Sequence, residues 1–178
     1  MSWMMNKTTI AKLALAAAGL AAGLTVAACS TQAATDTPAA AASQEPGVHP
    51  ESGLEVIDLT ITSAGTSANG PHRFRVEVAA TSQQQQRGLM FRTAMGADEG
   101  MIFPLAQVRM ASFWMRNTVI GLDIIFIGPD NRVLNVAANA VPYSETSIPA
   151  AGPTKAVLEL NAGRAAELGI APGDLVEW

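Results

Sequence analysis

Polar and apolar residues alternate along two segments at the start of the predicted folded region. The alternation in residues 54–62 has a period of two, which predicts a strand with one buried face. Residues 73–79 alternate as well. Their phenylalanine and valines are predicted to point inward, and their charged residues, Arg73, Arg75 and Glu77, are predicted to point outward.

A continuous apolar run, Leu122–Ile127, is the central feature of the second half of the chain. Gly121 precedes it and the turn sequence 128–131 follows it, which predicts a buried strand, a hairpin turn and a return strand over residues 132–137. One carboxylate, Asp123, interrupts the run. A buried charge is costly unless it is paired, so we expect the fold to supply Asp123 with a partner.

Shorter patterns predict the remaining elements. Thr81 followed by Gln84 has the capping-box pattern and predicts a short helix that ends at Gly88. A second short helix is predicted over residues 163–168. Further strands are predicted over residues 100–103, 155–160 and 175–178, and a loop over residues 141–153. Many short strands separated by turns indicate a mainly β fold, either a compact β-sandwich or a barrel-like domain, with two short helices.

The N-terminus has the pattern of an export signal. Lys7 and Lys12 precede an apolar run over residues 13–26 that is too short for a membrane-spanning helix. The run leads to Ala28 and Cys29, and this ending resembles a bacterial lipobox, in which lipid is attached to the cysteine. We expect residues 1–28 to be a signal peptide and Cys29 to be lipidated. An ordinary signal peptide cut near Ala28 is the alternative.

Residues 29–53 are rich in Ala, Thr, Pro, Ser and Gln and lack apolar periodicity, so they are predicted to form a flexible tether. Residues 54–178 are predicted to form a single β-rich domain. An exported, anchored chain of this kind would face the periplasm, and Ser30 after the cysteine is typical of sorting to the outer membrane. A lipid anchor would make the membrane a partner of the chain. The oligomeric state stays open.

Charge and metal-ligating residues argue against several classes of function. The formal net charge is −4, and from Pro71 onward nine basic residues stand against ten acidic residues, so no nucleic-acid surface is expected. Cys29 is the only cysteine, and the two histidines, His49 and His72, lie in the tether and at the edge of the domain. No zinc site, cysteine nucleophile or cofactor is therefore predicted.

Five stretches appear in an order that resembles one protein family. They are GLMFR at Gly88–Arg92, GMIF at Gly100–Phe103, FWMRNT at Phe113–Thr118, LDIIFI at Leu122–Ile127 and LELNAG at Leu158–Gly163, with Gly173 and Asp174 after them. Over residues 73–178 the chain resembles the bacterial and archaeal family called Domain of Unknown Function 192. The resemblance implies a compact β-rich domain that is often exported, and it implies no established activity.

Two carboxylates, Asp123 and Glu159, lie in apolar strands. Together in one cleft they could act as a general acid and base, or hold a ligand. Alternatively, each is a structural charge paired with an arginine such as Arg87, Arg92 or Arg109. Because 36 residues separate the two carboxylates in the sequence, both interpretations stay open.

Arg92, Trp114, Asn117 and Thr118 form a polar and aromatic set around the central run. An arginine for an anionic group, an aromatic platform and an amide donor would suit a sugar or peptide site, and together with Asp123 this set is the predicted ligand site. The structural alternative places Trp114 in the core, Asn117 and Thr118 in a hydrogen-bonded turn, and Arg92 in a pair with Asp123.

Five methionines lie within 26 positions of one another: Met90, Met95, Met101, Met110 and Met115. Thioethers bind Cu(I), so the cluster could be a copper site, with Met90, Met101 and Met115 as candidates. Methionine is also an adaptable filler of apolar cores.

Together these observations favour an envelope lipoprotein that presents a small binding or accessory domain, rather than an enzyme. Its ligand would be an envelope glycan, a peptide or a partner protein. A hydrolase or lyase that acts on an envelope glycan through Asp123 and Glu159 is the first alternative, and copper binding through methionines is the second.

Overall fold

The computed structural model describes residues 47–65 and 70–178. The predicted signal peptide, residues 1–28, the predicted lipidation site Cys29 and most of the predicted tether lie outside the described residues. Within the described part of the chain, no helix combines the length and the apolar character that a membrane span requires.

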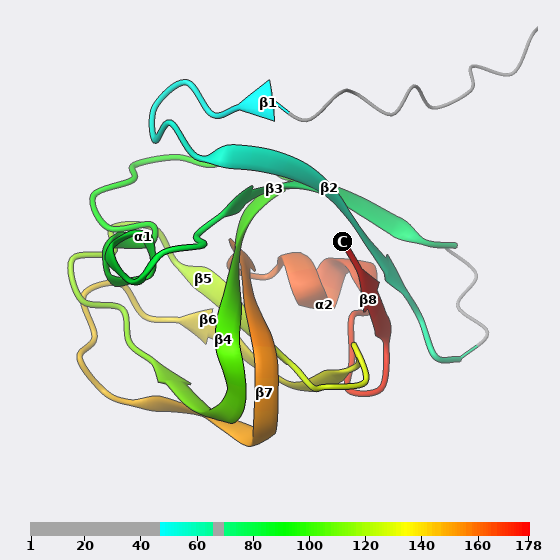
Figure 1. Cartoon of the computed structure of the whole chain (residues 1–178). Helices are drawn as coiled ribbons and strands as arrows, with labels where there is room; N and C mark the ends of the chain where they lie inside the picture. The colour runs from blue at the N-terminus through cyan, green and yellow to red at the C-terminus, as the bar shows by residue number, and fades with distance from the viewer. Residues whose placement is uncertain (1–46, 66–69) are drawn as a thin grey trace, which may run out of the picture. The chain divides into compact units, whose positions relative to one another are not determined.

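The described residues form one eight-stranded sheet and two short helices (Figure 1). The strands are β1 Gly47–Val48, β2 Glu55–Thr62, β3 His72–Val78, β4 Glu99–Phe113, β5 Leu122–Ile127, β6 Val133–Ala140, β7 Ile148–Asn161 and β8 Leu175–Glu177. The helices are α1 Ser82–Arg87 and α2 Arg164–Leu168.

The strand order is β1-β2-β3-β4-β7-β5-β6, and β8 also pairs with β2. All neighbouring strands are antiparallel except β3 and β4, which are parallel and are connected through α1. An isolated bridge between Arg132 and Leu175 brings β8 close to the start of β6, but the sheet does not close into a barrel. The predicted mainly β class with two short helices is therefore confirmed.

The capping-box prediction for α1 is also confirmed. The Thr81 hydroxyl oxygen accepts a hydrogen bond from the Gln84 N–H at 3.2 Å, and the Gln84 side-chain oxygen accepts one from the Thr81 N–H at 2.8 Å. These bonds satisfy N–H groups that a helix start otherwise leaves without partners. The helix ends at Gly88, whose N–H donates to the Gln84 carbonyl.

Apolar side chains cover both faces of the central strands. One cluster includes Ile125 of β5, Leu158 of β7 and Ala165 of α2. The other cluster, on the opposite face, includes Ile124 and Phe103 and adjoins the segment after α1 through Leu89. Because both faces are covered, all six residues of β5 are buried, as the continuous apolar run predicted.

Several boundaries and orientations differ from the prediction. β7 begins at Ile148, inside the predicted loop 141–153, and β4 continues to Phe113, ten residues beyond the strand predicted over 100–103. Residues 47–48, which the sequence placed in the tether, pair with β2. Glu77 was predicted to point to solvent, but it is 3% exposed because Arg92 and the segment after β1 cover it.

Candidate functional site

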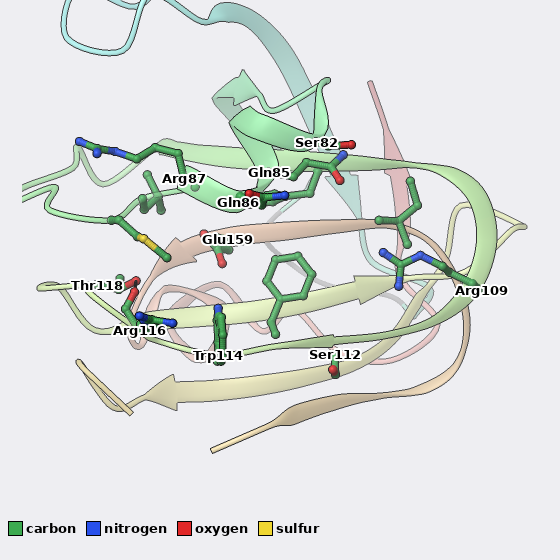
Figure 2. Close-up of a pocket in the computed structure, with 16 residues that line it drawn as sticks. Ser82, Gln85, Gln86, Arg87, Arg109, Ser112, Trp114, Arg116, Thr118 and Glu159 are labelled. Atoms are coloured by element: carbon green, nitrogen blue, oxygen red, sulfur yellow. Dashed lines mark hydrogen bonds between the residues drawn. The ribbon is translucent and has the colours of Figure 1, made fainter. Parts of the chain in front are cut away.

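A pocket of about 340 Å³ lies between α1, β4 and the turn that follows β4 (Figure 2). Its walls come from segments far apart in the sequence. Polar and charged residues dominate its lining, and these are Ser82, Gln85, Gln86, Arg87, Arg109, Ser112, Arg116, Thr118 and Glu159. Its apolar and aromatic lining comes from Leu89, Met90, Phe103, Leu105, Phe113 and Trp114, with Gly88 completing the set. The volume is at the lower end of the range for small-molecule sites.

Local interactions hold α1 against β4 and so shape the pocket. The Gln85 side-chain amide donates to the carbonyl oxygens of Ala79 at 3.1 Å and Pro104 at 2.7 Å. Gly88 turns the chain from α1 towards β4 with φ of 46° and ψ of −137°, a backbone conformation that favours glycine, and it lies beside the Phe103 ring. The Phe103 and Phe113 rings pack edge to face at 5.1 Å and give the pocket an apolar wall.

Glu159 reaches this pocket from β7. In Figure 2 its carboxyl group lies between Gln86 and Arg87 of the α1 side and Trp114 and Thr118 on the other side. The residue is 5% exposed, and burial raises the pKa of its carboxyl group from the ordinary value of 4.5 to about 8. Among the described residues, none forms a hydrogen bond or an ion pair with this carboxyl group. At neutral pH the group is therefore mostly protonated and can donate a hydrogen bond into the pocket.

Three arginines line the same pocket: Arg87, Arg109 and Arg116. The Arg116 Nε lies 3.9 Å from Glu145 Oε1, and both of these side chains are more than half exposed. Within residues 47–65 and 70–178, neither Arg87 nor Arg109 has a carboxylate partner. With Glu159 protonated, the lining carries a local excess of positive charge, which favours an anionic ligand.

Asp123, the predicted partner of Glu159, serves a different purpose. Its Oδ1 accepts hydrogen bonds from the N–H groups of Asn139 at 2.8 Å and Gly163 at 3.0 Å, and its Oδ2 accepts one from Ala165 at 2.8 Å. The carboxylate therefore ties β6 and the start of α2 to β5. The structural alternative paired Asp123 with an arginine, whereas in the structure its partners are three backbone N–H groups.

The structure does not bring Asp123 and Glu159 together. In the ladder between β5 and β7, Asp123 pairs with Leu160, and Glu159 pairs with Ile124. Because successive residues of a strand point to opposite faces, the two carboxylates lie on opposite faces of the sheet. The proposed acid–base pair, and with it the hydrolase or lyase that depended on it, does not fit this arrangement.

Arg92 forms a buried pair with Glu77 rather than with Asp123. Its Nη1 donates to Glu77 Oε1 at 2.9 Å and its Nη2 donates to Oε2 at 3.1 Å, while the Ser52 hydroxyl also donates to Glu77. Arg92 is 7% exposed and borders a separate hollow that Glu51 and Ser52 also line. Both Nη nitrogens are thus engaged by Glu77, and Nε lies 3.4 Å from Glu51 Oε2.

Two other members of the predicted ligand site, Trp114 and Thr118, do line the pocket around Glu159. Trp114 is 48% exposed, so it is not a core residue. Asn117 lies in the turn between them with a left-handed backbone (φ 54°), and its side-chain amide donates to the Met90 sulfur at 3.8 Å. The pocket thus takes Trp114 and Thr118 from the predicted ligand site and Glu159 from the predicted acid–base pair.

The structure places the five methionines in different surroundings. Met101 and Met115 are buried in the second apolar cluster and Met95 packs against it, whereas Met110 is 60% exposed and Met90 lines the pocket. Over the described ranges, no three His, Cys, Asp or Glu side chains gather where they could hold a metal ion.

Sequence reasoning missed the arginines and the helix as parts of the site. Arg87 and Arg109 were considered only as partners of buried carboxylates, and Gln85 and Gln86 only as helix residues. A weak signal was available: β4 carries Arg109 and Ser112 within a stretch that ends in Phe113 and Trp114. In the pairing of β4 with β7, Glu159 lies opposite Met101, and only the folded pocket, whose lining includes Arg109 and Ser112, places this stretch around the same cavity as Glu159.

Comparisons with known proteins agree with this fold. A family model for DUF192, described as uncharacterized ACR, matches residues 64–178. A solved structure of a protein of unknown function from Novosphingobium aromaticivorans DSM 12444 is 60% identical, covers 80% of this chain and 99% of that chain, and has a TM-score of 0.74. A putative transcription regulator from Sinorhizobium meliloti 1021 is 39% identical, with 67% of this chain and 91% of that chain covered and a TM-score of 0.63. No curated protein matches the chain.

Proposed function

Because this chain belongs to the Domain of Unknown Function 192 family, whose description names no activity, we propose a function from the site itself. The domain binds a small organic anion in the pocket around Glu159, and it does so as the ligand-binding part of a membrane-anchored envelope lipoprotein.

The observation that carries this proposal is the contrast between Glu159 and its surroundings. A carboxyl group that is 5% exposed and has no partner among the described residues reduces the stability of the fold. Strongly perturbed groups of this kind in a cavity are typical of functional sites. A protonated Glu159 supplies one hydrogen-bond donor, and Arg87, Arg109 and Arg116 supply positive charge.

The stretches that resemble the family support the same location. Four of the five contribute residues to the pocket: GLMFR supplies Met90, GMIF supplies Phe103, FWMRNT supplies Trp114 and Thr118, and LELNAG supplies Glu159. The fifth, LDIIFI, forms β5, which pairs with β7 beside Glu159. The residues of the resemblance are therefore concentrated around this pocket.

The envelope part of the proposal is supported by the sequence of the N-terminus. The basic start, the apolar run over residues 13–26 and Cys29 fit an exported chain with a lipid on that cysteine. We expect palmitate labelling of the protein in a Gram-negative host and loss of the label in Cys29→Ser. Labelling that persists in Cys29→Ser would contradict the anchor, without bearing on the pocket.

Thermal unfolding of the full chain tests the ligand site. The probes are glucuronate, succinate, citrate and inorganic phosphate at pH 6.5, where Glu159 is protonated. A ligand present at 100 times its Kd raises the free energy of unfolding by roughly 2.7 kcal/mol, and a stabilisation of that size produces a readily measured rise in Tm. We expect at least one of the organic acids to raise the Tm, and we expect Arg109→Gln to remove the effect.

Arg73→Gln is the matched control, because it removes the same charge from an exposed site on β3 that does not line the pocket. It should respond to the probes as the wild type does. The proposal is wrong if no probe raises the Tm, or if the rise persists in Arg109→Gln and Arg116→Gln.

A further inference from the structure

Three exposed aromatic side chains belong to the loop of the pocket that carries Trp114 and to two loops hydrogen-bonded to it. Phe91 is 55% exposed, Trp114 is 48% exposed and Tyr143 is 61% exposed. We call these three residues the aromatic rim. Large exposed apolar side chains that gather beside a polar pocket mark interaction surfaces more often than isolated ones do.

Backbone hydrogen bonds tie the three loops of the rim to one another. The Phe91 N–H donates to the Asn117 carbonyl at 2.9 Å, and the Tyr143 N–H donates to the Thr118 carbonyl at 3.1 Å. Phe91 and Tyr143 both adopt left-handed backbone conformations, with φ of 65° and 62°. Such conformations cost energy for bulky residues and are concentrated at functional sites, so a large ring at each position calls for an explanation.

Two pocket arginines also contact the rim. The Arg87 guanidinium lies 4.9 Å from the centre of the Phe91 ring, and the Arg116 guanidinium lies 5.6 Å from the centre of the Trp114 ring. These cation–π contacts hold positive charge beside exposed rings. The positive charge of the pocket therefore continues onto the aromatic rim.

We infer that the aromatic rim extends the pocket into a binding surface for an acidic glycan chain. One acidic sugar unit occupies the pocket, and the neighbouring units pack against the rim. This inference rests on the proposed function, and it names the class of ligand and the surface that recognises its length.

The chemistry of an acidic sugar matches the three kinds of group at the site. Its carboxylate suits the arginines and a protonated Glu159. Its hydroxyls suit the Gln86 amide and the acceptor oxygens of Gln85 and Thr118, whose donors are engaged within the protein. The C–H faces of a sugar ring are apolar and flat, so they pack against aromatic rings whose edges remain in water. A chain of such units offers an apolar ring face on each unit, so a longer chain can contact more than one ring of the rim.

Isothermal titration calorimetry on the full chain at pH 6.5 tests the inference. The probes are galacturonic acid and its linear oligomers of three and six units. The comparators are glutamate oligomers of the same lengths and neutral maltohexaose. We expect the affinity to rise at least tenfold from the single unit to the trimer, with no comparable rise for the glutamate oligomers and no binding of maltohexaose.

Phe91→Asn and Tyr143→Asn, combined, remove two rings, and asparagine tolerates the left-handed backbone of both positions. In this double variant we expect the gain with chain length to fall below threefold. The matched control is Val141→Asn, which removes a 66% exposed apolar side chain from the same loop as Tyr143 and should retain the full gain.

The outcomes separate this inference from the proposed function. If galacturonic acid binds but the oligomers bind no better, or the double variant keeps the gain, the glycan surface is wrong and the small-anion site remains. If the glutamate oligomers gain as much as the uronic acid oligomers, the rim selects repeated charge in a peptide, and the glycan is wrong. If neither the sugar acids nor the other organic anions bind, both proposals are wrong.

Discussion

Replacement of Glu159 by glutamine should stabilise the protein in a strongly pH-dependent way. Glutamine has nearly the same shape as glutamate but does not ionise, so the variant removes the cost of a buried acid and leaves the packing of β7 unchanged. The pocket also gives the amide access to water, which can satisfy its hydrogen bonds.

The magnitude follows from the pKa of Glu159, which burial raises from 4.5 to about 8. Below pH 4.5 the group is protonated in both the folded and the unfolded state, so it does not change the free energy of unfolding. Between pH 4.5 and 8 the unfolded chain has lost the proton and the folded protein still holds it, so the stability of the wild type falls by about 1.4 kcal/mol per pH unit. Above pH 8 the cost levels off at up to about 5 kcal/mol.

Urea unfolding followed by circular dichroism, at intervals from pH 4 to pH 9, measures this difference. We expect wild type and Glu159→Gln to have equal stability near pH 4, and the variant to be increasingly more stable as the pH rises to 8. Glu145→Gln is the control, because Glu145 is 66% exposed and its replacement should shift stability by a small, constant amount. A difference between wild type and Glu159→Gln that stays constant within about 0.5 kcal/mol from pH 5 to pH 8 would refute the reasoning.

Three further substitutions test the structural roles assigned above, each by urea unfolding at pH 7. Asp123→Asn places an amide nitrogen against backbone N–H donors and should cost roughly 2–3 kcal/mol, whereas an unchanged midpoint would mean that these bonds contribute little. Arg92→Leu leaves the buried Glu77 without its partner and should lower the free energy of unfolding by about 3–5 kcal/mol. Adding Glu77→Gln should restore part of that loss. A double variant as unstable as the single variant would contradict the pairing. Thr81→Ala removes the N-cap of α1 and should lower the free energy of unfolding by about 1 kcal/mol. An unchanged stability would mean that other contacts hold the start of the helix.

Local patterns in the sequence were sufficient to predict several elements. Thr81 and Gln84 specify the start of α1 because a capping box depends only on residues three positions apart. The continuous apolar run of β5 predicted burial on both faces, and the structure buries all six residues. The helix that ends at Gly169 was predicted for the same kind of reason, because a left-handed C-terminal residue favours glycine.

Features that depend on distant partners were not predictable in this way. Glu77 alternates with valines, which predicts an exposed side chain, but Arg92 lies fifteen residues further on and encloses it in a buried pair. β7 begins at Ile148 because it pairs with the end of β4, where Ile148 lies opposite Phe113. The pocket has the same origin, since its lining combines Arg109 of β4 with Glu159 of β7, two residues 50 positions apart on strands that pair only in the folded protein.

The two carboxylates in the apolar strands look alike in the sequence, but their hydrogen-bond partners in the structure differ. Asp123 and Glu159 occupy neighbouring positions of the ladder between β5 and β7, and both are almost completely buried. The Asp123 carboxylate accepts hydrogen bonds from three backbone N–H groups and so contributes to the fold, whereas no described residue donates to the Glu159 carboxyl group. A sheet that holds a leucine or a methionine at position 159 is expected to be more stable, so the acid calls for an explanation outside the fold, and the proposed ligand supplies one. That asymmetry, rather than the presence of a carboxylate in a strand, is the reason to search for the ligand on the Glu159 face.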